Sequence, residues 1–349
     1  MAVPHSDEVR NGVRVGLLQA SSRDDHATLY RYRRIVSASV CVVDANGRIV
    51  REAKVAREPE VLINWFRGLG FTVARIGLEA GPLSQWLYAG MRDVGLPVEL
   101  LETRHVRDAF KAMPVKTDRK DARGIAQLMR LGWFRPVHCK SLPAQEVRAL
   151  LTARKLLQSK NHDVEMSLRG VLRGFGLKVG RTTPRTFAAR IHELVAGHPT
   201  LSTIAEALLA ARGTLFEQWQ KLEKRLRSLA REDGRVRLLM TTPGVGPIVG
   251  LTYAAAIDDP GRFKSSKTVG AHFGLTPKKY QSGETDVNGR ISKIGDSGVR
   301  TALYEAANEI GDFSHAFLSR AARYLWRSNS AQAHLDVMVF RLQQLASGQ

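Results

Sequence analysis

Residues 35–55 read IVSASVCVVDANGRIVREAKV, and this stretch decides the fold of the N-terminal part of the chain. Two runs rich in β-branched residues flank Asn46-Gly47, a pair that is typical of a tight hairpin turn. Helical spacing follows at 58–69 and 83–94, and strand patterns follow at 71–79 and 97–101. A hairpin followed by alternating strands and helices predicts a mixed α/β sheet over residues 35–140.

The rest of the chain has helical periodicity, so the predicted fold class is α/β plus α. After a helix at 118–131, two long charged helices at about 142–172 and 203–239 predict an antiparallel, coiled-coil-like stalk over residues 141–236. Residues 237–330 are expected to form a mainly α-helical C-terminal domain. We expect residues 1–34 to be an irregular N-terminal segment and residues 331–349 to be a tail.

The charge balance points to a polyanionic partner. The chain has 53 Lys and Arg against 33 Asp and Glu, a net charge of +20. Binding of a surplus of cations to phosphates is favoured by the release of counterions, so DNA is the expected partner. A merely basic soluble protein is the simpler alternative. Cys41 and Cys139 lack the spacing of a zinc site or a disulfide framework, and no apolar run is long enough to span a membrane. We therefore expect a cytoplasmic protein without a membrane partner.

Three carboxylates are candidate metal ligands. Glu79 ends an apolar strand pattern, and Asp118 and Asp121 lie three apart at a predicted helix start, which places both on one helix face. Carboxylate oxygens are the ligands that Mg²⁺ prefers, and sites for phosphoryl transfer are built from them. The alternatives are that Asp118 is an N-cap and that Asp121 belongs to a solvated face.

The C-terminal part contains TPGVGPIVG at residues 242–250. Its glycines, Gly244 and Gly246, stand between two apolar helical runs, as in a helix-hairpin-helix motif whose backbone amides meet a DNA phosphate. A plain turn between two helices explains the same pattern.

Together these motifs resemble the DEDD-type transposases of bacterial insertion sequences, the IS110 family, whose best-understood members act as bridge-RNA-guided serine recombinases. The resemblance covers about residues 35–330. It rests on IGLEAG at 76–81, KTDRKDAR at 116–123, PGVG at 243–246, FGLTPKKYQSG at 273–283 and ISKIGD at 291–296, in this order.

The resemblance implies a RuvC-like N-terminal domain with an RNase H fold. Glu79, Asp118 and Asp121 would be the second, third and fourth acids of the DEDD set and would bind Mg²⁺. Ser282 would attack a DNA phosphodiester and form a 5′-phosphoserine intermediate, with the acids supplied by a partner subunit. The resemblance also implies a guide RNA from the same element. The coiled-coil-like stalk indicates at least a dimer, so we expect a dimer or tetramer. Without it, Ser282 beside a glycine is an ordinary turn residue.

Basic side chains near Ser282 fit this chemistry. Lys278, Lys279 and Arg290 would neutralise the phosphate.

The first acid of the DEDD set is absent where the pattern expects it. Counting back from the strand at 35–43 leads to Tyr32, and the partial match Val15-Gly16-Leu17 is followed by Leu18 rather than Asp. Either the first 34 residues derive from a frameshift or an altered start, or Asp24 or Asp25 reaches the site by another path. Two further functions stay open: a Holliday-junction-type metal-dependent nuclease that uses only the acids, and a catalytically impaired nucleic-acid-binding remnant.

Overall fold

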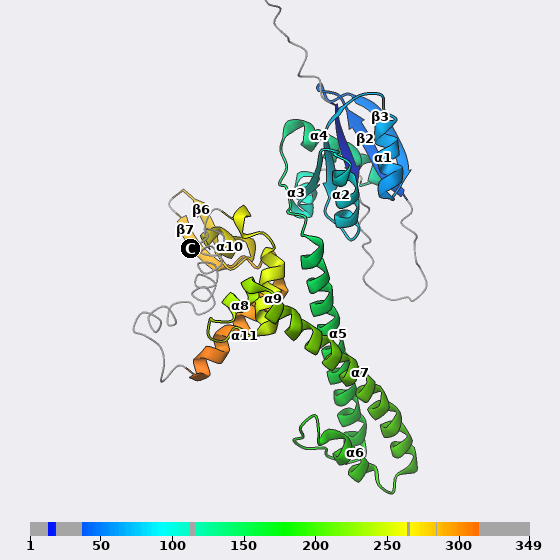
Figure 1. Cartoon of the computed structure of the whole chain (residues 1–349), viewed down its shortest axis with the longest axis vertical. Helices are drawn as coiled ribbons and strands as arrows, with labels where there is room; N and C mark the ends of the chain where they lie inside the picture. The colour runs from blue at the N-terminus through cyan, green and yellow to red at the C-terminus, as the bar shows by residue number, and fades with distance from the viewer. Residues whose placement is uncertain (1–12, 19–36, 112–115, 264–265, 284, 314–349) are drawn as a thin grey trace, which may run out of the picture. The chain divides into compact units, whose positions relative to one another are not determined.

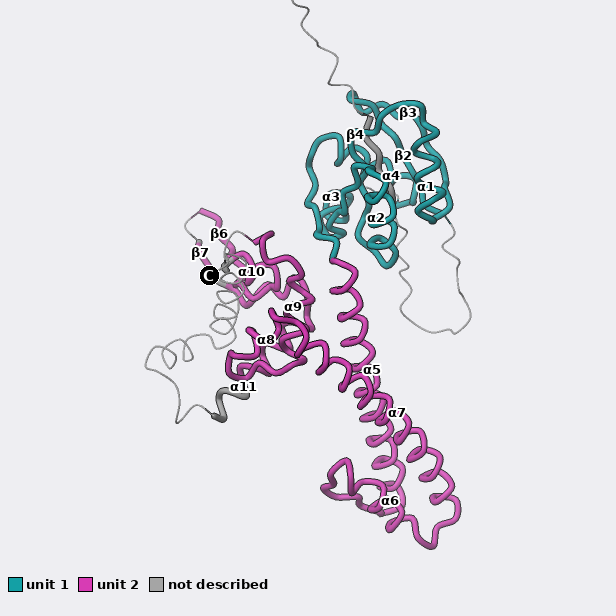
Figure 2. Tube along the Cα trace, in the orientation of Figure 1, with its two compact units in different colours: residues 1–140 teal, residues 141–349 magenta. Residues whose placement is uncertain are grey.

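The computed structural model divides into two compact units, residues 1–140 and 141–349, which are described one at a time (Figure 2). The structure describes residues 13–18, 37–111, 116–263, 266–283 and 285–313. In this part of the chain no helix is both long and apolar enough to cross a lipid bilayer.

Unit 1 is built on a five-stranded mixed sheet in the order β3-β2-β1-β4-β5 (Figure 1). Strand β1 pairs antiparallel with β2 and parallel with β4, and β5 is parallel to β4. The strands span Val13–Leu18 (β1), Ser37–Val43 (β2), Ile49–Ala56 (β3), Val73–Glu79 (β4) and Val98–Leu101 (β5). An antiparallel hairpin joined to parallel strands through β1 is the arrangement of an RNase H fold, which is consistent with the RuvC-like expectation.

The predicted hairpin is present between β2 and β3. A carboxylate oxygen of Asp44 accepts hydrogen bonds from the backbone amides of Asn46 (2.9 Å) and Arg48 (2.8 Å). Gly47 takes a φ of 83°, which a residue without a Cβ adopts at little cost. These local bonds fix the turn that sets the register of β2 against β3.

Alternation along β2 divides the core of unit 1 into two layers. Val40 and Val42 pack in one cluster with α1 and α2, whereas Cys41 and Val43 pack in another with α3 and α4. Successive side chains of a strand point to opposite faces, so the helices cover both sides of the sheet. The helices span Pro59–Arg67 (α1), Ser84–Asp93 (α2), Thr103–Ala109 (α3) and Asp118–Leu131 (α4).

Unit 2 begins with two long helices that lie side by side, α5 (Leu142–Gly174) and α7 (Pro199–Glu232) (Figure 1). The short helix α6 (Phe187–Val195) packs at the end of this pair that is farthest from α9 (Pro247–Ile257). The helix predicted to continue to residue 239 instead ends at Glu232, because Asp233 caps a separate helix α8 (Gly234–Leu239).

The rest of unit 2 packs around α9. Its core joins Tyr253 of α9, Phe273, and Leu303 of α11 (Ser297–Phe313). A 3₁₀ turn (Pro260–Arg262), helix α10 (Ser266–His272) and a hairpin of β6 (Pro277–Ser282) and β7 (Thr285–Ile291) complete the unit. The expectation of a mainly helical domain did not include this hairpin, whose first strand is exposed along its length.

The prediction that residues 1–34 are irregular is wrong in one respect. Residues 13–18 form β1, the central strand of the sheet, which we did not predict. Strand β2 is described from Ser37, and the predicted start at Ile35 lies outside the described residues. Asp24, Asp25 and Tyr32 lie outside the described residues, as does the predicted tail at 331–349.

Candidate active site

The start of α4 brings two of the predicted acids to the sheet. Thr117 is the N-cap, and its side chain accepts a hydrogen bond from the backbone amide of Lys120 at 3.2 Å. Thr117 therefore takes the capping role that was the alternative explanation for Asp118. Asp121 is only 5% exposed, which contradicts the alternative of a solvated face.

A close approach of α4 to the sheet sets the position of these acids. A Cβ on Gly77 of β4 would lie 2.6 Å from Cγ of Met129 and 3.0 Å from a methyl carbon of Ile125. The glycine allows α4 to pack directly against the strand that ends in Glu79. Helix and strand thus bring their carboxylates to the same edge of unit 1.

The pKa values of Glu79 and Asp121 are both raised in the folded chain. Burial raises the pKa of Glu79 to about 7, with Lys116 lowering it and Asp121 raising it further. Burial also raises the pKa of Asp121, while Lys116 lowers it and Asp118 raises it. Carboxyls whose pKa values are raised by burial and by neighbouring acids gain from a nearby cation, and Lys116 partly supplies that charge.

Strand β1 runs alongside the strand that ends in Glu79. Leu17 is in register with Leu78 of β4, so Leu18 lies level with Glu79 in the neighbouring strand. Leu18 also pairs with Ser39 of β2. In the described part of β1, a hydrophobic residue therefore stands beside the strand end that carries Glu79.

Sequence reasoning missed a residue that fixes α4. Glu52 of β3 accepts hydrogen bonds from Arg119 (2.8 Å to Nε) and from Arg123 (2.8 Å to Nη2), both on α4. The side chain of Glu52 is 15% exposed, and the bonds from Arg123 and Arg119 lower its pKa to about 2. The pattern available in the sequence was a lone acid in a strand and two arginines four apart on a helix. We infer that this pair of arginines orients the helix that carries Asp118 and Asp121.

The donor chemistry at this edge fits a hard divalent cation. Glu79, Asp118 and Asp121 are all carboxylates, and the pKa values of Glu79 and Asp121 are raised chiefly by burial and further by a neighbouring acid, both of which a bound cation would offset. Within the described residues, however, no three acidic, His or Cys side chains converge as a ready-made metal site.

Ser282 lies in unit 2, at the end of β6 and next to Gly283, whose φ is +57°. It is exposed, as are Lys278, Lys279 and Arg290 on the same hairpin. Lys279 forms an ion pair with Asp286 across the hairpin at 3.0 Å. The structure therefore places the three acids on one unit and Ser282 on the other.

The base of this hairpin is tightly built. Gly274 and Gly295 approach so closely that a Cβ on Gly274 would lie 2.2 Å from the backbone of Ile294. One guanidinium nitrogen of Arg300 on α11 lies within hydrogen-bonding distance of the carbonyl oxygens of Phe273 (3.0 Å), Ile294 (2.9 Å) and Gly295 (3.2 Å). The strand that carries Ser282 therefore emerges from a rigid base.

The two glycines of the predicted helix-hairpin-helix lie between α8 and α9. Gly244 has a φ of 75°, and Gly246 is the N-cap of α9, followed by Pro247 at the first helical position. A turn thus joins the two helices, and the binding of phosphate by the backbone amides of this turn stays a prediction.

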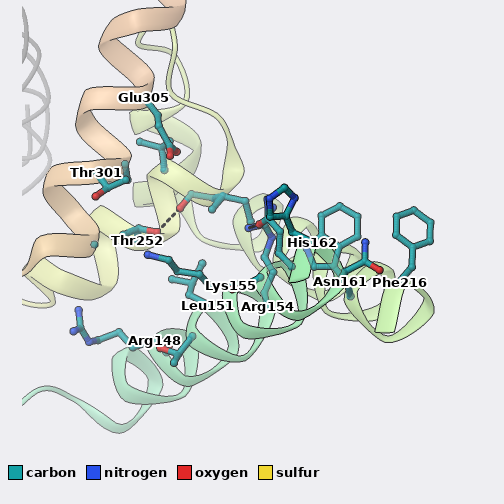
Figure 3. Close-up of a pocket in the computed structure, with 18 of the residues that line it drawn as sticks. Arg148, Leu151, Arg154, Lys155, Asn161, His162, Phe216, Thr252, Thr301 and Glu305 are labelled. Carbon is teal, nitrogen blue, oxygen red and sulfur yellow. Dashed lines mark hydrogen bonds between the residues drawn. The ribbon is translucent and has the colours of Figure 1, made fainter. Parts of the chain in front are cut away.

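Unit 2 also contains a cavity of 860 Å³ lined by parts of α5, α7, α9 and α11 (Figure 3). Its cations Arg148 and Arg154 are paired with carboxylates of the same unit, Asp296 (2.7 Å) and Glu223. Asp296 also accepts backbone bonds at the start of α11. The pair with Arg148 thereby joins α5 to the helix that supports the hairpin base.

Comparisons with known proteins identify the family. Residues 37–176 match a family model described as a transposase of the DEDD IS110 type, and residues 236–320 match the transposase IS116/IS110/IS902 family. The chain is 27% identical over 276 residues to a transposase for insertion sequence element IS1111A from Coxiella burnetii, covering 78% of this chain and 74% of that protein.

Other relatives have similar names. A probable family 20 transposase from Pseudomonas aeruginosa is 26% identical, covering 67% of this chain and 70% of that protein. A transposase for IS1328 from Yersinia enterocolitica is also 26% identical, covering 66% of this chain and 69% of its own length. The two family matches together span both units, so the chain belongs to the IS110-type family of insertion-sequence transposases and is an enzyme of that class.

Proposed function

We propose that this transposase cleaves and rejoins DNA strands with Ser282 as the nucleophile and with Glu79, Asp118 and Asp121 as ligands of Mg²⁺. The observation that carries the proposal is the burial of Asp121 beside Glu79, on a helix held against the sheet at Gly77. Acids whose pKa values are raised by burial and by neighbouring acids cluster at functional sites.

The proposed chemistry is two transesterifications. The Ser282 Oγ attacks a phosphodiester phosphorus, an Oγ–P bond forms, and the bond from phosphorus to the 3′ oxygen breaks. The departing oxygen takes a proton and leaves as a 3′-hydroxyl, while the 5′-phosphate stays on the serine. A 3′-hydroxyl of another strand then attacks that phosphorus and releases Ser282.

The chain's own groups suit these steps. Without a cation the pKa of Glu79 is about 7, so a bound divalent cation would hold this carboxyl in its ionised, metal-binding form near neutral pH. The bound divalent cation would supply Lewis-acid stabilisation of the phosphate. Lys278 and Arg290, exposed on the hairpin beside Ser282, would neutralise phosphate charge. A second copy of the chain would supply the acids to each serine, which makes the active species a dimer or a tetramer.

We further propose that DNA and a structured RNA of the same element bind the basic surface. The net charge of +20 supports polyanion binding in general, and the family membership supports DNA as the substrate. Sequence selection by pairing with the RNA would leave the protein to bind phosphates.

The test is a covalent adduct assay with the full-length protein, the DNA ends of its element and the RNA transcribed from the element. We expect a denaturant-stable protein–DNA adduct that is absent in Ser282→Ala. Ser292→Ala is the matched control, because Ser292 lies at the base of the same hairpin and bonds to Thr276 through its backbone amide, which the substitution keeps. An adduct that forms equally in Ser282→Ala overturns the assignment of the nucleophile.

One observation favours a second candidate function, a nucleic-acid-binding protein with impaired catalysis. Leu18 follows the partial match to the family pattern at residues 15–17 and lies level with Glu79, and it is not an acid. Loss of one of four carboxylates removes a ligand and a negative charge from a divalent site. This candidate predicts salt-sensitive binding with no adduct in either Mg²⁺ or Mn²⁺.

A further inference from the structure

We propose that the far end of the stalk is a separate binding site for the phosphate backbone of a nucleic acid. This surface, here called the stalk tip, consists of the end of α5 and the loop before α6, with the exposed cations Arg173, Lys178, Arg181 and Arg185. It lies at the opposite end of the α5–α7 pair from α9 and the hairpin (Figure 1). The proposal rests on the proposed function for the nature of its ligand.

The stalk tip has a strongly one-sided charge. Residues 166–200 contain six Lys and Arg and a single acid, Glu193. That acid is already paired with Arg190 at 2.8 Å. The nearest acid before this segment, Glu165, is paired with Arg212 at 2.6 Å. The carboxylates in and beside the tip are therefore committed to other arginines.

Three arginines hold the loop in place through its carbonyl oxygens. Arg169 of α5 donates to Gly180 (2.6 Å), and Arg212 of α7 donates to Pro184 (3.1 Å). Arg190 of α6 donates to the carbonyls of residues 178 and 179, both at 3.4 Å. The loop backbone is thus fastened to all three helices around it.

Aromatic packing fixes these arginines in turn. The guanidinium groups of Arg169 and Arg212 lie over the buried ring of Phe187, at 5.3 and 4.9 Å from its centroid. The ring belongs to a hydrophobic cluster of α5, α6 and α7 that is separate from the cluster around α9. The loop therefore rests on a hydrophobic cluster of its own.

The other four cations of the stalk tip are exposed and, within the described part of the chain, are not paired with carboxylates. Among the residues that the structure describes, Arg173, Lys178, Arg181 and Arg185 are exposed, and no carboxylate pairs with any of their side chains. Arg173 lies one helical turn beyond Arg169, so it is next to the loop that Arg169 binds. A rigid loop that displays unpaired cations fits a ligand with regularly spaced negative charges.

A nucleic acid is the ligand that these features favour. Its phosphates match several cations at once, and their binding releases counterions. Phe175, which follows α5 and is 64% exposed, adds an aromatic surface on which an unpaired base can stack. Most of the tip lies in residues 177–235, between the two family matches, so the family models assign it no role.

The experiment measures binding rather than cleavage. The full-length variant Arg173→Gln/Lys178→Gln/Arg181→Gln/Arg185→Gln is titrated with duplex DNA and with single-stranded RNA of equal length, at several salt concentrations. The control removes the same charge elsewhere, in Arg67→Gln/Lys224→Gln/Arg225→Gln/Arg231→Gln, since these cations are exposed on other surfaces. Thermal melts followed by circular dichroism verify that both variants are folded.

We expect the tip variant to flatten the plot of log Kobs against log salt. The slope should change by about 0.9 for each phosphate that the variant no longer neutralises on duplex DNA, or by about 0.7 on single-stranded RNA. The control should retain the wild-type slope to within the equivalent of about one phosphate. The nucleic acid with the larger change is the one that the tip binds.

Equal slopes for the tip variant and the control on both nucleic acids overturn the proposal. Unchanged slopes together with a changed oligomeric state in light scattering would instead identify the tip as an interface between copies of the chain, and also overturn it. A failed serine adduct with a changed slope would refute the proposed chemistry and leave the tip site standing, so the two failures are distinguishable.

Discussion

Replacing Glu79 with glutamine should abolish a specific pH dependence of stability. Burial and the neighbouring Asp121 raise the pKa of Glu79 from 4.5 to about 7 in the folded chain. In the unfolded chain the carboxyl returns to its ordinary value. The folded state therefore binds a proton more tightly than the unfolded state between these two pH values, and stability falls as the pH rises through this window.

The size of the effect follows from the shift. At about 1.4 kcal/mol per pKa unit, ionised Glu79 costs the fold about 3 kcal/mol above neutral pH in the absence of metal. The cost is absent below about pH 4.5, where both states are protonated. A glutamine keeps the shape and stays neutral, so Glu79→Gln should be more stable than wild type by up to about 3 kcal/mol above neutral pH and similar to it in acid.

The assay is urea unfolding of the full-length protein in EDTA across this pH range. Hydrogen-exchange mass spectrometry reads peptides of unit 1 separately from those of unit 2. Glu60→Gln, at an exposed position on α1, is the control and should follow the wild type. Parallel pH dependence in wild type and Glu79→Gln would refute the conclusion that partial burial beside Asp121 raises the pKa of Glu79.

Three further changes test other parts of unit 1. Glu52→Gln should lower the free energy of unfolding by about 2 kcal/mol near neutral pH, because it weakens the bonds to α4. Since the pKa of Glu52 is held near 2, its contribution in the wild type is present above about pH 4.5 and is lost as the pH falls toward 2. Faster hydrogen exchange in α4 would reveal this loss. Gly77→Ala should cost about 1–3 kcal/mol in urea unfolding by overpacking against Met129, and a cost unchanged by adding Met129→Ala would contradict this. Leu18→Asp should tighten Mg²⁺ binding in calorimetry, and unaltered affinity would show that position 18 does not face the acids.

The sheet of unit 1 was predictable wherever local chemistry determined it. The Asn46-Gly47 turn, the apolar runs of β2 and β4, and the helix from Asp118 to Leu131 all follow from nearby residues. Strand β1 was not predictable in this way. Its six residues are a short apolar run between polar segments, and only pairing with β2 and β4 makes them a strand.

The residues of the candidate site also differ in whether local sequence could indicate them. The sequence indicated Glu79, Asp118 and Asp121 because each stands at the end of an element. It could not show that Asp121 is buried or that Lys116 lowers the pKa of Asp121, since both depend on how α4 packs on β4. Glu52 and the hairpin that carries Ser282 were missed because their partners come from distant segments or from an exposed strand without a buried face.

The central place of β1 has a consequence for how the chain folds. This strand leaves the ribosome before the other four, yet its parallel partner β4 follows about 60 residues later, so the middle of the sheet closes only after a long loop has formed. Until then β2 and β3 can pair as a hairpin with one edge open, which invites aggregation. Removing residues 1–18 would leave that hairpin and the β4–β5 pair without the strand that joins them. Soluble expression of unit 1 should therefore depend on these residues more than on any later loop.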